Sequence, residues 1–195
     1  MRKFATLGAV VAFGISGAAF AAEPSHSFVE AGYGYSELAG GVADGDGFNV
    51  DVSYELPANF ILSAGYRDFS FDGFGDLKEL NAGVGYKFTL SESFDLVTGV
   101  AFEQIDDGSD KYSGFSLNLG TRGRITDTVE LSAGLKYQDM ESDLGLPTTF
   151  SATMGIRKYF NEAFAAGLEV GKSGLLAFDE TSFTATLRYD FGGGM

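Results

Sequence analysis

Strict alternation of apolar and polar residues is the feature that most restricts how this chain can fold. From Ser25 onward, apolar residues recur at every second position, and no window keeps the apolar spacing of an amphipathic helix beyond about a turn. Side chains of a β-strand point alternately to the two faces of a sheet. The pattern therefore predicts one nearly all-strand domain, which suits a 195-residue chain with 28 glycines.

Four short turns recur at a nearly constant interval. They lie at residues 56–60, 90–94, 125–129 and 160–164, with centres at 58, 92, 127 and 162, so the intervals are 34, 35 and 35 residues. A large apolar residue flanks each turn on both sides. This regularity indicates that one pair of hairpins repeats along the chain.

Longer connections rich in Gly and Asp alternate with the short turns. We expect these loops at residues 37–46, 70–76, 106–111, 141–147 and 174–181. The alternation predicts ten strands, with eight as the alternative, at residues 27–36, 47–56, 60–69, 78–90, 94–105, 112–125, 129–140, 148–160, 164–173 and 182–191. An even strand number with short turns on one side and long loops on the other is typical of an all-β transmembrane antiparallel up-and-down β-barrel.

The two faces of the expected strands differ sharply in chemistry. One face is apolar throughout, with Lys158 and Lys172 as cationic exceptions near strand ends. The other face mixes charges of both signs. Its charged residues are Glu30, Asp51, Glu55, Arg67, Glu79, Lys87, Glu103, Arg122, Arg124, Glu130, Lys136, Arg157, Glu169, Arg188 and Asp190.

Glycine indicates which face points inward. Alternation alone does not separate a lipid-exposed barrel from a soluble, lipocalin-like one, but the strand glycines lie on the charged face, and Gly123 is nearly the only one on the apolar face. A narrow interior needs residues without bulk beside long charged side chains, whereas a solvent-facing glycine only weakens a strand. We therefore expect the charged residues to line the lumen and the apolar face, with aromatic residues towards its strand ends, to meet lipid.

The luminal charges leave two states open. Ions in a narrow interior must be either hydrated or paired, so the lumen is either a narrow water path for small solutes or a plug of ion pairs. Long arginine side chains would fill much of a ten-strand interior, so we do not expect diffusion of large solutes.

Export is indicated by the first 21 residues. Arg2 and Lys3 precede an apolar stretch ending near Phe20, and the small residues Ala19 and Ala21 fit a cut before Ala22. We predict a signal peptide at 1–21 and a barrel domain at 22–195; an uncleaved membrane anchor is the alternative. Cleavage would change the formal charge from -14 to -16, which argues against a nucleic-acid partner.

Enzymatic and metal chemistry find little support in the sequence. His26 is the only histidine, lies next to the predicted cut and is expected to be exposed, so we predict no enzyme and no cofactor. Absence of cysteine excludes disulfides and thiolate metal sites. The acidic loop residues Asp106, Asp107 and Asp110, like residues 44–47 and 141–143, either ligate Ca²⁺ or Mg²⁺ that bridges lipopolysaccharide phosphates or form solvated turns.

Three segments resemble the small outer-membrane β-barrel proteins of proteobacteria, the porin-family or OmpA-like barrel domains. They are residues 28–33 (FVEAGY), residues 93–103 (SFDLVTGVAFE) and the closing residues 187–191 (LRYDF). The resemblance implies location in the outer membrane of a Gram-negative cell and contact with lipid and lipopolysaccharide. It also implies delivery by periplasmic chaperones and the barrel-assembly machinery, with Leu187, Tyr189 and Phe191 as the assembly signal. Residues 192–195 (GGGM) depart from the family pattern, in which the terminal residue is the aromatic one.

The resemblance is specific for architecture, because this fold hosts unrelated functions. We expect a structural or small-solute pore role with a narrow charged lumen. The alternative is a surface-exposed adhesin or a ligand- or cation-binding barrel that acts through its acidic loops.

Overall fold

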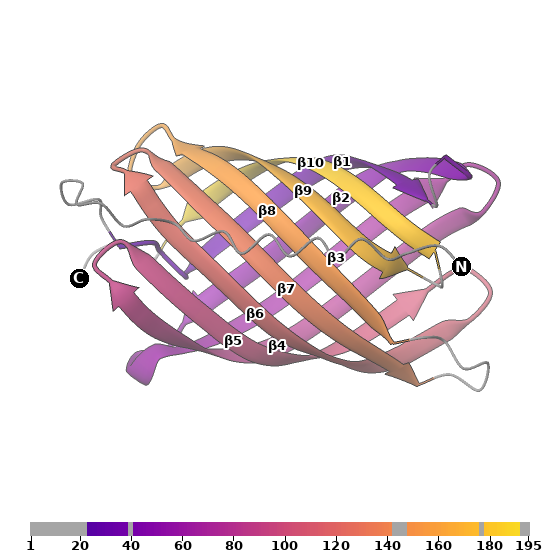
Figure 1. The fold of residues 1–195 in the computed structure, drawn as a ribbon, viewed down its shortest axis with the longest axis horizontal. Helices are drawn as coiled ribbons and strands as arrows, with labels where there is room; N and C mark the ends of the chain where they lie inside the picture. The colour runs from indigo at the N-terminus through magenta and orange to yellow at the C-terminus, as the bar shows by residue number, and fades with distance from the viewer. Residues whose placement is uncertain (1–22, 39–40, 142–147, 176–177, 192–195) are drawn as a thin grey trace, which may run out of the picture.

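Ten strands pair with their neighbours in chain order, and the first pairs with the last, so the sheet closes into an antiparallel barrel (Figure 1). The computed structural model describes residues 23–38, 41–141, 148–175 and 178–191. The predicted signal peptide at 1–21 and the tail at 192–195 lie outside the described residues. Within the described part of the chain, no helix has the length and apolar character needed to cross a membrane.

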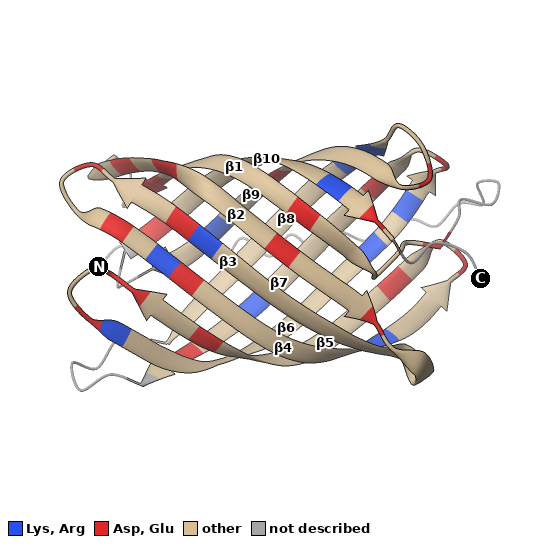
Figure 2. Ribbon diagram, turned by 180° about the vertical axis from the view of Figure 1, so that it is seen from behind, with Lys and Arg blue, Asp and Glu red and all other residues tan. Residues whose placement is uncertain are grey.

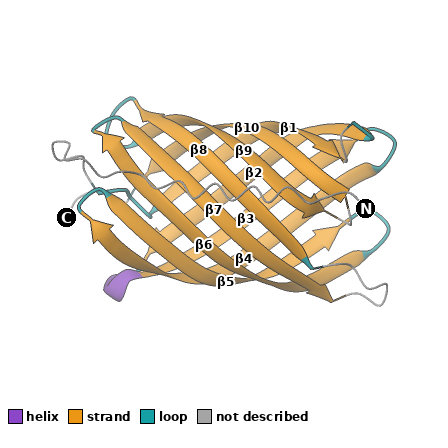
Figure 3. Cartoon of the chain, viewed as in Figure 1, coloured by secondary structure: helices purple, strands orange, loops and turns teal. Residues whose placement is uncertain are grey.

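The ten predicted strands are all present, which confirms the ten-stranded barrel over the eight-stranded alternative. Short turns, including the 3₁₀ turn η1, lie at one end of the barrel, and the remaining connections lie at the other (Figure 3). The elements are β1 (Phe28–Leu38), β2 (Ala43–Glu55), η1 (Pro57–Asn59), β3 (Phe60–Phe71), β4 (Gly75–Ser91), β5 (Phe94–Asp106), β6 (Lys111–Thr126), β7 (Val129–Glu141), β8 (Thr149–Tyr159), β9 (Phe164–Leu175) and β10 (Phe178–Asp190).

The strands run further towards the loop end than the sequence predicts. The loops expected at 37–46 and 174–181 are wrong over much of their length, because β2 already begins at Ala43 and β10 at Phe178. Residues 44–47 belong to β2 and pair with β1. Their side chains keep the strand alternation: Asp44 and Asp46 are exposed while Gly45 and Gly47 are buried. Two-sided pairing in the closed sheet outweighs the local turn preference of Asp and Gly.

The exterior of the barrel is apolar. Large apolar side chains on the outward face are exposed, for example Leu168 at 65% and Leu187 at 68%. A soluble protein rarely exposes so continuous an apolar surface, whereas a transmembrane barrel presents it to the hydrocarbon of the bilayer. The fold is therefore that of a transmembrane β-barrel.

Aromatic rings gather around the short-turn end of this exterior. Neighbouring rings pair there across adjacent strands or around the closing seam, with centroid distances of 5.4 Å for Phe60 and Tyr86, and 4.8 Å for Phe164 and Tyr189. Tyr54 stacks on Phe191 at 6.3 Å. Rings at this position suit the boundary between hydrocarbon and headgroups.

Inward-facing glycines allow close approach of neighbouring strands. A Cβ placed on Gly114 of β6 would lie 2.1 Å from the Asp139 carbonyl oxygen and 2.7 Å from the Met140 Cα of β7. Gly123, the exception on the apolar face, is covered by the ring of Phe94, which lies opposite it on β5. An aromatic ring over a strand glycine replaces the packing that the missing side chain would give.

We predict that Gly114→Ala destabilises the barrel, because the clash is with backbone atoms that cannot turn aside. The expected cost is about 1–3 kcal/mol in the free energy of unfolding. Gly120→Ala in the same strand is the matched control, since its Cβ would meet only the Ala133 carbonyl oxygen at 3.6 Å. The measurement is the temperature at which the compact band of the folded barrel disappears on a gel. Equal temperatures for both variants would contradict the prediction.

Candidate functional site in the barrel lumen

Charged residues occur along the length of the strands and not only at their ends, as the coloured ribbon of Figure 2 shows. Among the described residues, ten carboxylates and seven cationic side chains on strands are inward-facing and buried or half-buried. The carboxylates are Glu30, Asp51, Glu55, Glu79, Asp95, Glu103, Glu130, Glu169, Glu180 and Asp190. The cations are Arg67, Lys87, Arg122, Arg124, Lys136, Arg157 and Arg188.

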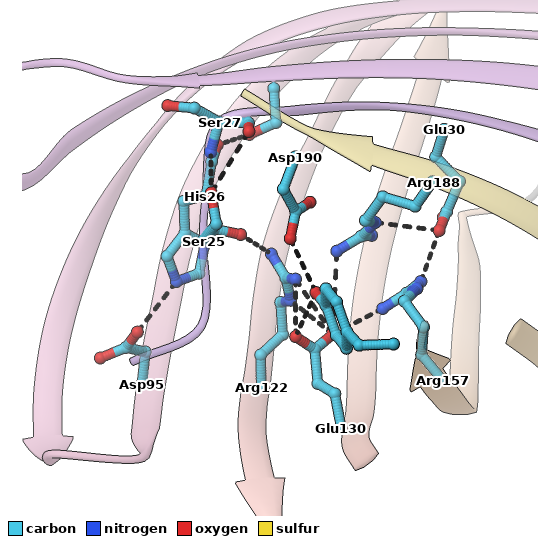
Figure 4. A network of polar contacts seen from close by, with 12 residues as sticks. Ser25, His26, Ser27, Glu30, Asp95, Arg122, Glu130, Arg157, Arg188 and Asp190 are labelled. Atoms are coloured by element: carbon cyan, nitrogen blue, oxygen red, sulfur yellow. Dashed lines mark hydrogen bonds and ion pairs between the residues drawn. The ribbon is translucent and has the colours of Figure 1, made fainter. Parts of the chain in front are cut away.

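Glu130 of β7 is the centre of the largest group of ion pairs (Figure 4). Its side chain is 0% exposed and accepts hydrogen bonds from Arg122, with Nη2 to Oε2 at 2.9 Å, and from Arg157, with Nη1 to Oε1 at 2.5 Å. The Nη1 of Arg188 lies 3.7 Å away. One buried carboxylate thus contacts guanidinium groups from three other strands, as expected where buried ions must be paired.

Glu30 of β1 extends this group across the closing seam of the barrel. Its Oε2 accepts hydrogen bonds from Arg157 Nη2 at 2.6 Å and from Arg188 Nε at 3.0 Å. Arg188 also lies over the ring of Phe28, 3.6 Å from the centroid. We call Glu30, Arg122, Glu130, Arg157 and Arg188 the arginine–glutamate cluster. It joins β1, β6, β7, β8 and β10 through the lumen.

Tyr159 and Asp190 adjoin the cluster at the short-turn end. The Tyr159 hydroxyl is 2.8 Å from Asp190 Oδ2 and 3.2 Å from Glu130 Oε2, and its ring lies 4.1 Å from the Arg124 guanidinium carbon. Arg124 therefore lies beside the cluster and stacks on an aromatic ring rather than facing a carboxylate directly.

An N-terminal segment (residues 23–27) occupies the short-turn end of the lumen. Glu23 contacts Lys87 Nζ at 2.8 Å, and the Ser25 carbonyl oxygen accepts a hydrogen bond from Arg122 Nη1 at 2.7 Å. Lys87 also contacts Glu55 at 2.7 Å. The segment is thus linked directly to β4 and β6, and through Lys87 to β2, and it narrows this mouth of the barrel.

His26 is buried in this segment, so the expectation of an exposed histidine is wrong. It is 3% exposed, and its Nε2 lies 3.0 Å from Oδ2 of the fully buried Asp95. The apolar–polar alternation along β5 places Asp95 on the inward face, so the sequence pattern could have identified Asp95 as a luminal residue. The inward course of residues 23–27 has no such periodic signal and was missed.

Ion pairs also cross the lumen towards the loop end. Arg67 of β3 contacts Glu79 of β4 at 3.2 Å and also pairs with Glu180 of β10. Ser173 donates a hydrogen bond to Glu180 at 2.9 Å. Sequence reasoning missed Glu180, because it placed that residue in a loop.

Between the arginine–glutamate cluster and the ion pairs of Arg67, Lys136 of β7 pairs with Glu103 of β5 at 2.9 Å. Ser116 of β6, which lies between those two strands, donates a hydrogen bond of 2.6 Å to the same carboxylate. Lys136 and Glu103 thus compensate each other's charge.

An apolar cluster occupies part of the interior at the loop end, which the sequence pattern did not predict. Phe69, Phe71, Leu77, Ile105 and Met140 pack there with Leu38 and Ala43, and Tyr112 lies against them. The cluster comes from β1 to β7, so it narrows one side of the lumen and leaves the wall formed by β8, β9 and β10 polar.

Two adjoining cavities remain inside the barrel. The loop-end cavity has a volume of about 350 Å³ and the turn-end cavity about 420 Å³. Five residues line both: Glu30, Asp51, Asn81, Thr153 and Glu169. We call this shared lining the waist. The cavities extend from the level of His26 at one end to that of Glu180 at the other.

The acidic connection after β5 uses its carboxylates for local geometry. Asp106 Oδ1 accepts the Gly108 N–H at 2.9 Å, and Asp107 Oδ1 accepts the N–H groups of Asp110 and Ser109 at 2.8 and 2.9 Å. These backbone donors hold the pKa of Asp107 below its usual value. Across the described ranges, no three Asp, Glu or His side chains are arranged to hold a metal ion.

The residues of the expected assembly signal lie on the exterior near the short-turn end. Leu187, Tyr189 and Phe191 are all exposed and follow the outward parity of β10. The Phe191 N–H donates to the Ser27 carbonyl oxygen at 3.0 Å, which connects the last described residue to the start of β1. Residues beyond Phe191 lie outside the described part.

Comparison with known proteins identifies the architecture. No protein-family model and no curated protein matches the chain. Among solved structures, an outer-membrane channel from Pseudomonas putida F1 is similar at a TM-score of 0.55 and 11% identity, covering 91% of this chain and 100% of that one. The NanC porin is similar at 0.52 and 8%, covering 84% and 100%. The chain has the fold of an outer-membrane β-barrel.

That similarity concerns the fold alone, because the identities are low. The names of these neighbours are those of a channel and a porin, and neither is that of an enzyme. The fold predicted from the residue pattern is thereby confirmed.

We predict that Glu130→Gln lowers stability strongly, since it leaves Arg122, Arg157 and Arg188 without their shared carboxylate. Loss of one partner of a buried ion pair costs about 3–5 kcal/mol in the free energy of unfolding. The measurement is urea-induced unfolding in detergent or lipid, followed by tyrosine fluorescence. Glu162→Gln, in the exposed turn before β9, is the control and is expected to match the wild type. A stable Glu130→Gln barrel would refute the central role of this carboxylate.

Proposed function

We propose that the protein is an integral outer-membrane pore for small solutes with a narrow charged lumen. The observation that carries the proposal is the pair of adjoining cavities, which run along the inside of a closed barrel with an apolar exterior. Polar and charged side chains line both cavities, so water can occupy them. Its partners in this proposal are outer-membrane lipid and lipopolysaccharide outside, and chaperones and the assembly machinery during export.

The lumen supports passage of small solutes only. The arginine–glutamate cluster and the N-terminal segment narrow one end, and the apolar cluster narrows the other. In this proposal ion pairs fill part of the cross-section, and a hydrated path for small solutes remains beside them.

An enzymatic role has little geometric support. His26 faces Asp95, as in a catalytic triad, but the hydroxyl of Ser53 donates to the His26 carbonyl oxygen at 2.7 Å rather than to the imidazole. A histidine acts as general base only when a nucleophile lies within reach of its ring. The pair is better explained as a buried anchor of residues 23–27.

The surface-interaction alternative is less well supported than a pore. It depends on long acidic loops, whereas β2, β9 and β10 extend into the expected loops and Asp107 is engaged by backbone N–H groups. In the described connection after β5, Asp106 and Asp107 are thus engaged by local backbone N–H groups.

We expect the protein to give discrete, small conductance steps in planar lipid bilayers, and His26→Ala to enlarge them by about twofold. The alanine removes a ring that lines the turn-end cavity and frees residues 23–27 from Asp95. Glu162→Gln is the matched control outside the lumen and should conduct like the wild type. Silence of protein that is folded by its heat-modifiable migration would contradict a pore.

A further inference from the structure

The waist is the level at which any solute crossing the barrel must pass from one cavity to the other. Three of its five side chains are carboxylates, those of Glu30, Asp51 and Glu169, and the others are the amide of Asn81 and the hydroxyl of Thr153. No cationic side chain lines both cavities within the described part of the chain. The passage is therefore flanked by oxygen ligands and negative charge.

Cations that line only one cavity are largely compensated. Arg67 pairs with Glu79 and Glu180, Lys136 with Glu103, and the cluster arginines with Glu30 and Glu130. Lys172 lines the loop-end cavity, but its side chain is exposed towards the rim. Arg124 lines neither cavity. A solute at the waist thus meets few positive charges that are free to attract it.

Two carboxylates at the waist lack a cationic partner. Asp51 accepts one hydrogen bond, from Asn49 Nδ2 at 2.6 Å, and Glu169 has no hydrogen bond or ion pair with any described residue. Glu30 differs, because Arg157 and Arg188 compensate it. Asp51 lies on β2, next to β1, and Glu169 lies on β9, next to β10, so the two carboxylates flank the β1–β10 seam.

On the loop-end side of the waist, the wall of the cavity contributes further oxygen atoms. Thr149, Ser151, Ser182, Thr184 and Thr186 line the loop-end cavity from β8 and β10. Hydroxyl oxygens can replace part of the hydration shell of a cation, as carbonyl oxygens do in selective channels. The apolar cluster on the opposite side keeps the solute beside this wall.

We propose that the pore selects small cations, and that Asp51 and Glu169 determine this selectivity. The inference rests on the proposed pore function and names its solute class. Uncompensated charges act strongly inside a narrow passage, because its low-dielectric walls focus their field on the path of the solute. The negative charge at the waist lowers the electrostatic free energy of a cation there and raises that of an anion of the same size.

The test is the reversal potential of the full-length protein in planar bilayers that separate two KCl concentrations. We expect K⁺ to be preferred over Cl⁻ in the wild type. Glu169→Gln and Asp51→Asn should each lower the permeability ratio by at least about twofold, and Glu169→Lys should lower it further. Glu92→Gln, in the exposed turn between β4 and β5, is the matched control and should leave the ratio unchanged.

The outcomes separate the inference from the pore function. Conduction that prefers Cl⁻ or is non-selective, or a ratio that neither neutralisation changes, would overturn cation selectivity and leave the pore intact. Absence of conduction from folded protein would contradict both the pore function and the cation selectivity. Heat-modifiable migration verifies folding of each variant, and if Glu169→Gln does not fold, Asp51→Asn decides.

Discussion

Compensation of buried charge is the constraint on which the rest of the structure depends. The exterior faces hydrocarbon, so the polar residues of every strand must share one narrow interior. Glu130 meets this requirement for arginines of three other strands, and Glu30 joins two of them to β1. Most of these pairs join adjacent strands, but Arg157–Glu30 and Arg188–Glu130 cross the lumen between strands that are not neighbours and occupy part of its cross-section.

The sequence determines this architecture to a large extent, because alternation and glycine placement express the same constraint. Apolar residues at every second position must meet lipid, and the glycines that accompany the charges leave room for long side chains and close strand contacts, as Gly114 does. Strand number and the short-turn positions follow from local patterns and were predicted correctly. Strand ends at the loop side were not, because closure of the sheet continues the pairing through Asp and Gly residues that favour turns.

The contents of the lumen were harder to predict than its lining. Parity shows that Glu130 and Arg157 face inward on neighbouring strands, but the contacts of Arg157 with Glu30 and of Arg188 with Glu130 join strands far apart in the sequence and depend on the stagger of the barrel. His26 and Glu180 were missed for different reasons. His26 lies before the first strand and carries no periodic signal, whereas Glu180 continues the inward parity of β10 but was placed in an expected loop. The apolar cluster around Phe69 was missed because inward positions near the loop end carry apolar side chains, whereas the inward positions of the remaining strand segments are mostly polar, charged or glycine.

The distribution of unpaired charge distinguishes a hydrated interior from a filled one. An interior that serves only to hold strands together is most stable when every ion is paired or replaced by apolar side chains, as around Glu130 and Phe69. Asp51 and Glu169 form no ion pair with a described residue, although both lie where the two cavities meet. An ionised carboxylate in such a position is stabilised by water or a mobile cation beside it. The same requirement that narrows the ends of the lumen with ion pairs and apolar side chains thus favours a hydrated passage at its centre.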